Sequence, residues 1–120
     1  MIGIVDIEAA GQGCIAVITF NAAAISRSDK IASASAQIKD FIEKNHPDRI
    51  VFDFGKVKFF SSQVLGMLLD VRAKIQTSNG EVVISAINPQ LHKVFRITNL
   101  DKLFKFFADK KSAVEAVSIN

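Results

Sequence analysis

The sequence predicts a single α/β domain over residues 1–120, with a mixed β-sheet of four to five strands and four helices. Three observations lead to this fold class. Strand-like and helix-like segments alternate in the order β-β-α-β-α-β-α-β-α, which is typical of a sheet with parallel strands covered by helices. Hydrophobic residues make up 49% of the chain and charged residues 22%, as in ordinary globular proteins. The 120 residues contain no linker-like, repeated or low-complexity segment, so they fit one core.

The first third of the chain predicts a β-hairpin followed by a helix. The β-rich segments 2–7 and 14–20 flank a glycine-containing break at 11–13, a pattern typical of two antiparallel strands. From about Ser26 the apolar residues recur every three or four positions, which indicates an amphipathic helix. We expect this helix to end before Pro47, because proline disfavours helical geometry in the residue that precedes it.

The middle of the chain predicts a buried strand, a helix and a second buried strand. The near-continuous apolar run 49–54 is expected of a strand that is covered on both faces. A helical pattern follows the pair Ser61 and Ser62 and closes at 78–80, where Ser, Asn and Gly are typical of a helix end. A second apolar run at 81–87 predicts the next buried strand.

The last third predicts a helix, a short strand and a final helix. Pro89 suits the first position of a helix, and the apolar positions of this helix include Ile97. The segment 103–107 predicts a short strand, and Asp109 and Ser112 open the final helix.

Composition argues against several classes of function. The net charge is only +3, with 15 basic residues interspersed among 12 acidic ones, so we expect no nucleic-acid partner. The single cysteine, Cys14, and the lack of a Cys/His cluster predict no disulfide, no metal site and no cofactor. No apolar run approaches the roughly 20 residues of a membrane-spanning helix, and the first residues do not resemble a signal peptide. We therefore expect no membrane insertion and a cytoplasmic location.

The sequence also predicts that the protein is not an enzyme. It has no Gly-x-Ser-x-Gly elbow, no Walker loop and no dinucleotide-binding fingerprint. His46 and His92 are far apart and have no evident nucleophile partner, which argues against a Ser-His-Asp hydrolase. No catalytic residue is assigned.

The most informative segment is the junction where Ser61 and Ser62 stand between a strand pattern and a helix pattern. A helix N-terminus accommodates phosphate well, because unpaired N–H groups and the positive end of the helix dipole meet there. Phosphorylation of either serine would add a charge of about −2 and could switch a binding surface. Serine is also a common helix cap, and the two roles are compatible.

Two further residues near this junction are candidates. Asp53 lies near the end of the preceding strand, where an acidic group could orient the serine loop or could simply be solvated. Gly66 interrupts the helix pattern, and it could permit close packing against the sheet or lower helix stability by up to about 1 kcal/mol if exposed.

With these segments in place, the chain resembles the STAS domains, and among them the stand-alone anti-sigma-factor antagonists. The segments that carry the resemblance are 50–54, 57–68, 81–86 and 94–104, and together they extend it over nearly the whole chain. The resemblance implies the STAS fold and a function in regulated protein–protein binding. The implied partner is both an anti-sigma factor and a serine kinase, whose phosphorylation of the antagonist releases the complex, and a phosphatase restores the binding form.

The resemblance also implies which residues act. Ser62 falls on the family's phosphorylatable serine, and Ser61 is an alternative acceptor. Leu65 and Gly66 match the Leu and Gly that follow that serine in the family, and Asp53 matches the strand aspartate. The partner-binding residues implied in this way are Asp53, Ser61, Ser62, Gln63, Leu65 and Gly66.

The serine motif departs from the family pattern at three positions. Ser61 replaces the Asp before the serine, Gln63 replaces the second hydroxyl residue, and Val64 replaces the first glycine. An alternative function is therefore a constitutive STAS scaffold of a stress-sensing or transporter-associated complex, without control by phosphorylation. A small-molecule sensor is a third interpretation, and the oligomeric state stays open between a monomer and a weak dimer.

Overall fold

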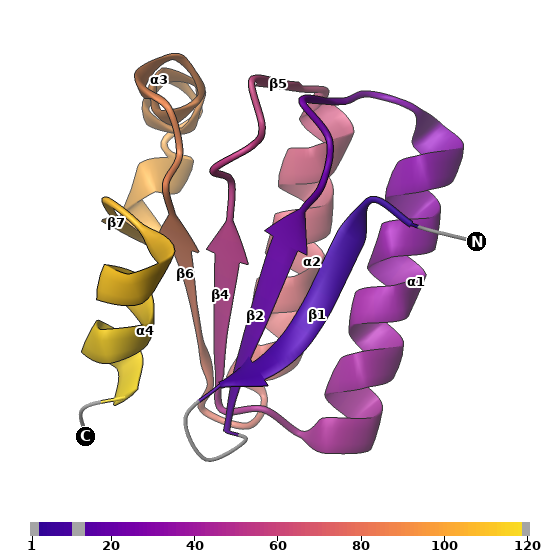
Figure 1. Ribbon diagram of the computed structural model, residues 1–120, viewed down its shortest axis with the longest axis vertical. Coiled ribbons are helices and arrows are strands. Elements are labelled where there is room, and N and C mark those ends of the chain that lie inside the picture. Colours follow the sequence, from indigo (N-terminus) through magenta and orange to yellow (C-terminus); the bar gives the residue numbers. More distant parts are fainter. Residues whose placement is uncertain (1–2, 11–13, 119–120) are drawn as a thin grey trace.

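The computed structural model describes residues 3–10 and 14–118, which form a mixed α/β fold with four α-helices and a five-stranded sheet (Figure 1). The predicted hairpin break at 11–13 and residue 2 of the first β-rich segment lie outside the described residues. The elements are β1 (Val5–Ala10), β2 (Ile15–Phe20), β3 (Ala24–Ile25), α1 (Ser28–Asn45), β4 (Arg49–Asp53), β5 (Phe59–Phe60), α2 (Ser62–Gln76), β6 (Glu81–Ser85), α3 (Pro89–Ile97), a 3-10 turn (Leu100–Lys102), β7 (Lys105–Phe107) and α4 (Lys110–Ser118).

The main sheet has the strand order β1-β2-β4-β6-β7. β1 runs antiparallel to β2, with Val5 opposite Phe20, and the other neighbouring pairs are parallel. Parallel strands need crossover connections, which the helices provide. The carboxyl ends of β2, β4 and β6 therefore meet at one edge of the sheet, the upper edge in Figure 1.

Helices cover both faces of the sheet. α1 and α2 lie side by side on one face, and α4 lies on the other (Figure 1). The larger core lies beneath α1 and α2, where the apolar stripe predicted for α1 is buried. The smaller core lies beneath α4 and consists of Ile15, Val17, Val51, Val83, Ala113 and Val117. The strands β2, β4 and β6 have near-continuous apolar runs because their side chains enter both cores.

Two short strands form a separate parallel sheet that the sequence pattern did not predict. β3 pairs with β5, so that Ala24 lies opposite Phe59 and Ile25 opposite Phe60. Each strand has only two residues, too few to show the alternation by which a strand is recognised in a sequence. This small sheet joins the segment before α1 to the segment before α2.

The predicted helix ends are largely confirmed, with one difference in burial. Pro89 begins α3, and the Asn88 side chain caps that helix by accepting a hydrogen bond of 2.9 Å from the backbone N–H of Leu91. Asp109 does the same at the start of α4, accepting from the N–H of Ser112 at 2.7 Å. Ile97, expected on the apolar face of α3, is 70% exposed. It is two positions from the buried Phe95 and therefore lies on nearly the opposite side of the helix.

Candidate functional site

The helix α2 begins near the sheet edge where the parallel strands end (Figure 1). Ser62 is its first residue and is exposed. Ser61 precedes it with extended backbone angles of φ −82° and ψ 163°, which is the geometry of a helix N-cap residue. The first turn of α2 contains no acidic residue, and no side chain of the described residues caps it. The positive end of the α2 dipole is therefore open to an anion at the position of Ser62.

The small β3–β5 sheet holds this helix end in place. The backbone N–H of Ser61 donates to the carbonyl of Ile25 at 2.9 Å, and the N–H of Lys58 donates to that of Ala23 at 2.7 Å. Phe60 is buried and packs edge-on against Phe95 of α3, with ring centroids 6.1 Å apart. These contacts fix the backbone just before Ser62, so the serine is presented on a rigid scaffold.

Gln63 joins the N-termini of the two neighbouring helices. Its side-chain oxygen Oε1 accepts a hydrogen bond of 3.0 Å from the hydroxyl of Ser28, the first residue of α1. Beside Ser28, the Arg27 guanidinium forms an exposed ion pair of 3.2 Å with Asp29. The surface around Ser62 therefore combines the starts of α1 and α2, with the charged residues Arg27, just before α1, and Asp29, in its first turn.

Ser61 does not act as the hydrogen-bonding cap that its residue type suggests. It occupies the N-cap position, but its side chain makes no cap hydrogen bond. Its Oγ atom is buried and has no hydrogen-bond partner in the part of the chain that the structure describes. An unpaired buried hydroxyl is costly, so Ser61 does not contribute the stability expected of a serine cap.

Two of the remaining candidate residues, Leu65 and Asp53, support the site from within the fold. Leu65 is only 8% exposed and belongs to the core beneath α2, so it anchors the helix rather than extending outward. Asp53 turns its Oδ1 atom toward its own loop, where the N–H of Gly55 donates to it at 2.9 Å. It therefore shapes the β4 end, and among the described residues neither serine hydroxyl donates a hydrogen bond to its carboxylate.

Gly66 does not pack against the sheet, which corrects one of the two interpretations of this glycine. It is exposed on α2, and a Cβ atom at this position would meet no atom within 4 Å apart from the neighbouring residues and backbone of its own helix. Ser62 and Gly66 are four positions apart, so they lie on the same face of the helix. The glycine leaves a flat area beside the exposed serine.

The sequence patterns missed Phe59 and Ser28 as parts of this surface. Phe59 is 55% exposed because strand alternation turns it outward while Phe60 points into the core. From the sequence alone either phenylalanine of the pair could be the buried one, because a short strand can turn either face toward the core. Ser28 joins the site only through its contact with Gln63, which is 35 positions away and therefore invisible to local pattern.

Within residues 3–10 and 14–118, no group of three or more His, Cys, Asp or Glu side chains could hold a metal ion. The same described residues contain no helix that is both long enough and apolar enough to cross a membrane. His92 lies against the Phe106 ring at a centroid distance of 4.3 Å, so it has a packing role.

Comparison with known proteins adds a family and a fold. The model of the STAS domain matches residues 7–113. A STAS-domain containing protein of Pseudomonas aeruginosa is 32% identical over 59 residues, or 49% of this chain. The matched region spans 58% of that relative, little more than half of its length.

Solved structures share the fold at low sequence identity. An anti-sigma-factor antagonist (STAS) domain protein from Planctomyces limnophilus superposes with a TM-score of 0.83 at 17% identity, covering 97% of this chain and 98% of that one. The phosphorylated form of SpoIIAA, a Bacillus cell fate determinant, superposes with a TM-score of 0.74 at 20% identity, covering 94% and 98%. At such identities the likeness establishes the STAS fold, which was the fold predicted from the sequence.

Proposed function

The chain belongs to the STAS domain family, and from this premise we propose that it is an anti-sigma-factor antagonist whose binding to its partner is switched off by phosphorylation of Ser62. The partner in this proposal is an anti-sigma factor that is also the serine kinase, and a phosphatase regenerates the binding form. The binding surface is the exposed area around the start of α2. It includes Ser62, Gln63 and Gly66 from the predicted set, and Phe59 and Ser28 in addition.

The single observation that carries the proposal is the exposure of Ser62 at the uncapped first turn of α2. A kinase can reach the hydroxyl without unfolding the helix. A phosphoryl group is tolerated by the free domain there, because it lies at the positive end of the helix dipole. In a complex, the same charge at a packed interface adds repulsion and a desolvation cost, which releases the partner.

The first test is intact-mass and peptide mass spectrometry on the protein isolated from its native cells. The proposal predicts one added phosphate on Ser62 under some growth or stress conditions. Phosphate on Ser61 instead would transfer the switch to that residue, although its buried Oγ atom argues against it as an acceptor. Repeated absence of phosphate under all conditions would contradict the proposal.

The second test compares partner binding by Ser62→Ala and Ser62→Asp, with Ser78→Ala as the control. Ser78 is an exposed serine at the other end of α2 and belongs to no proposed surface. We expect Ser62→Ala and the control to bind an anti-sigma factor as the parent does, and Ser62→Asp to lose binding. Equal binding by both Ser62 variants would show that this serine is not the switch.

A constitutive STAS scaffold is a second candidate, and one observation favours it. Ser61 stands where the family pattern has an aspartate, and its buried, unpaired Oγ atom cannot offer a kinase the same negative charge. This candidate predicts tight co-purification with a partner that is the same for the parent, Ser62→Ala and Ser62→Asp. The binding comparison above therefore separates the two candidates.

A further inference from the structure

A second surface feature lies at the end of α2 opposite Ser62. A cavity of about 210 Å³ opens between the last turn of α2, the start of β6 and the segment that leads into β7. Its lining includes the charged residues Arg72, Glu81, Lys102 and Lys105. Arg72 and Ser62 are ten positions apart on α2, so the cavity is roughly 15 Å from the serine along the helix axis.

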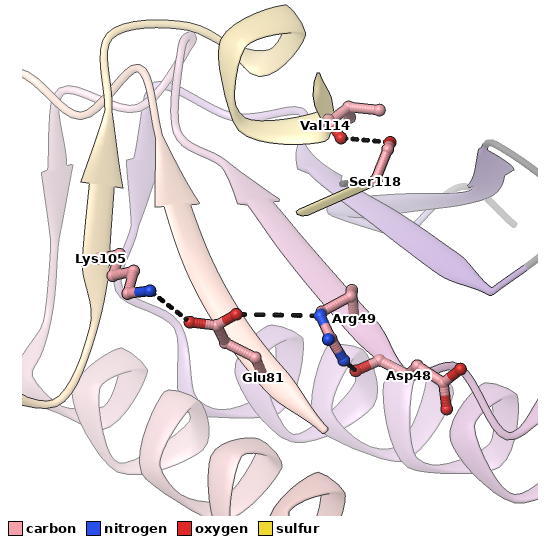
Figure 2. Close-up of polar contacts among 6 residues, drawn as sticks. All are labelled: Asp48, Arg49, Glu81, Lys105, Val114 and Ser118. Atoms are coloured by element: carbon pink, nitrogen blue, oxygen red, sulfur yellow. Dashed lines mark hydrogen bonds and ion pairs between the residues drawn. The ribbon is translucent and has the colours of Figure 1, made fainter. Parts of the chain in front are cut away.

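The cavity has more positive than negative charge. Its one carboxylate, that of Glu81, lies between two cations: Oε2 is 3.4 Å from the Lys105 Nζ atom, and Oε1 is 3.8 Å from the Arg49 Nε atom (Figure 2). The Lys105 side chain is 73% exposed, and an exposed ion pair of this kind contributes little free energy. Lys105 can therefore exchange its partner for an incoming carboxylate at small cost.

The other two cations have unused hydrogen-bonding capacity. The Nε atom of Arg72 donates to the carbonyl of Leu103 at 3.1 Å, which fixes the guanidinium at the cavity. Its terminal nitrogens and the Lys102 ammonium have no carboxylate partner in the described part of the chain. A fixed guanidinium beside a free ammonium is a suitable arrangement for binding a carboxylate.

One exposed aliphatic side chain lines the cavity, and a second lies at the end of the neighbouring helix α3. Leu103, which is 38% exposed, forms part of the cavity lining, and Ile97 is 70% exposed at the end of α3. The two residues lie on either side of the 3-10 turn, and α3 packs against that turn. Because Ile97 lies beyond the cavity lining, a ligand that covers both aliphatic side chains must be extended, as a peptide segment is.

The distribution of charge along the chain also favours an acidic ligand at this cavity. Residues 89–120 contain six basic and three acidic residues, whereas residues 1–88 contain nine of each. The whole net charge of +3 is therefore contributed by the segment that includes Lys102 and Lys105. Lys110 and Lys111 of this segment lie on α4 rather than at the cavity, but Lys102 and Lys105 line it, and an excess of positive charge favours the approach of an acidic partner.

From these observations we infer that the surface formed by Arg72, Ile97, Lys102, Leu103 and Lys105 is a docking site for an acidic segment of a protein partner. A carboxylate of that segment enters the cavity between Arg72 and Lys102, and a neighbouring apolar side chain packs on Leu103. The site is separate from the Ser62 surface, so the domain can hold one partner at each end of α2.

The test uses a defined probe, an N-acetylated and C-amidated peptide of alternating glutamate and leucine. Amide chemical shifts of the ¹⁵N-labelled protein are followed during titration with this peptide and with its glutamine-for-glutamate counterpart. We expect the glutamate peptide to shift the amides of residues 102–105 and of Arg72. Binding should weaken steeply when salt is raised from about 20 mM to about 200 mM, because salt screens the exposed charges.

Two variants test the charge and apolar parts separately. Lys102→Glu should weaken binding at least about tenfold, whereas Lys111→Glu, an exposed α4 lysine outside the cavity, should weaken it less than about twofold at the same net charge. Leu103→Ser should also weaken binding while keeping the carbonyl that accepts from Arg72. Unchanged amide spectra away from the site would show that each variant is folded.

Four outcomes would overturn the inference. One is equal weakening by Lys102→Glu and Lys111→Glu, which would mean non-specific attraction. The second is equal binding of the glutamine peptide, and the third is shifts confined to the Ser62 end or absent. The fourth is self-association of the parent chain through this surface, measured by sedimentation and abolished by Lys102→Glu, since the occupant would then be a second copy.

Discussion

Gly66 leaves an open position on the exposed face of α2, in the second turn after Ser62. Glycine in an exposed helix interior costs up to about 1 kcal/mol relative to alanine, and a Cβ atom here would contact nothing within 4 Å beyond the neighbouring residues and backbone of its own helix. Gly66→Ala should therefore stabilise the free protein and raise its thermal midpoint by a few degrees. Thermal unfolding followed by circular dichroism measures this change.

Gly80→Ala is the matched control for this substitution. A Cβ atom at Gly80 would lie 2.9 Å from the carbonyl oxygens of Asp48 and Ile75, so we expect destabilisation. If Gly66→Ala raises stability and lowers partner binding, the flat area beside Ser62 belongs to the interface. A fall in the thermal midpoint of Gly66→Ala would contradict the open geometry.

The two helix-cap positions before α2 and α3 should respond in opposite ways to alanine. Ser61 has a buried hydroxyl without a hydrogen-bond partner among the described residues, so Ser61→Ala should leave the free energy of unfolding unchanged or raise it slightly. Asn88 accepts from the Leu91 N–H at 2.9 Å and donates to the Val57 carbonyl at 3.2 Å. Asn88→Ala should therefore cost about 1 to 2 kcal/mol. Urea unfolding of both variants measures the difference, and a comparable loss in Ser61→Ala would show that its hydroxyl is paired in solution.

At the scale of whole elements, the start of α4 should give a pH-dependent contribution to stability. The backbone N–H of Ser112, together with its side chain, donates to the Asp109 carboxylate and holds the pKa of Asp109 below its ordinary value of 3.8. A lowered pKa in the folded state favours folding above the unfolded-state value, and this contribution is lost as the pH falls through the folded-state value.

Asp109→Ala should therefore destabilise the protein at neutral pH, and the difference from the parent should shrink as the pH is lowered below 3.8. Denaturant unfolding at neutral and acidic pH measures this. Asp70→Ala is the control, because Asp70 is an exposed α2 residue whose carboxylate accepts no hydrogen bond among the described residues. A difference for Asp109→Ala that stays constant over the whole pH range would contradict the capping role.

The elements with long periodic patterns could be predicted from the sequence, and the short non-local ones could not. The 18 residues of α1 provide several turns of apolar repeat, and the apolar run of β4 marks a strand between two cores. β3 and β5 have two residues each, and their pairing depends on chain segments about 35 positions apart. Their formation is decided by tertiary packing around Phe60, which no local pattern contains.

In the candidate site, too, some features follow from local sequence pattern and others depend on tertiary packing. The position of Ser62 at the start of a helix follows from local pattern, because a strand run gives way to a helical one there. The Ser28–Gln63 contact, the outward turn of Phe59 and the unpaired Ser61 hydroxyl arise from the way in which α1, β5 and α2 meet. Residue type predicted a hydrogen-bonding cap at this junction, but tertiary geometry decides whether the bond forms.

At the scale of the whole molecule, the two proposed surfaces lie at opposite ends of α2, and the helix joins them through the core. Most of the apolar residues of α2 are fully buried against the sheet and against the neighbouring elements of the larger core. A densely packed helix of this kind does not shift in response to one surface charge. A switch at Ser62 should therefore act locally, by changing the surface that a partner contacts, rather than by remodelling the fold.

A negative charge at each end of α2 should change stability through the helix dipole without changing the fold. Ser62→Asp places a carboxylate in the uncapped first turn, where the helix dipole favours it by about 0.3 to 1 kcal/mol at low salt. Ser78→Asp places the same charge just beyond the last turn, where the dipole opposes it by a similar amount. Urea unfolding at low and high salt should show a gain for the first variant, a loss for the second, and a reduction of both effects by salt.

Amide spectra should show where in the molecule the Ser62→Asp substitution has its effect. For Ser62→Asp we expect shifts confined to the starts of α1 and α2, which the Ser28–Gln63 hydrogen bond connects. If the free protein gains stability while partner binding is lost, phosphorylation releases the partner through charge at the interface. A loss of stability above about 1 kcal/mol, or shifts that extend to the cavity at Arg72, would show instead that the switch changes the packing of α2.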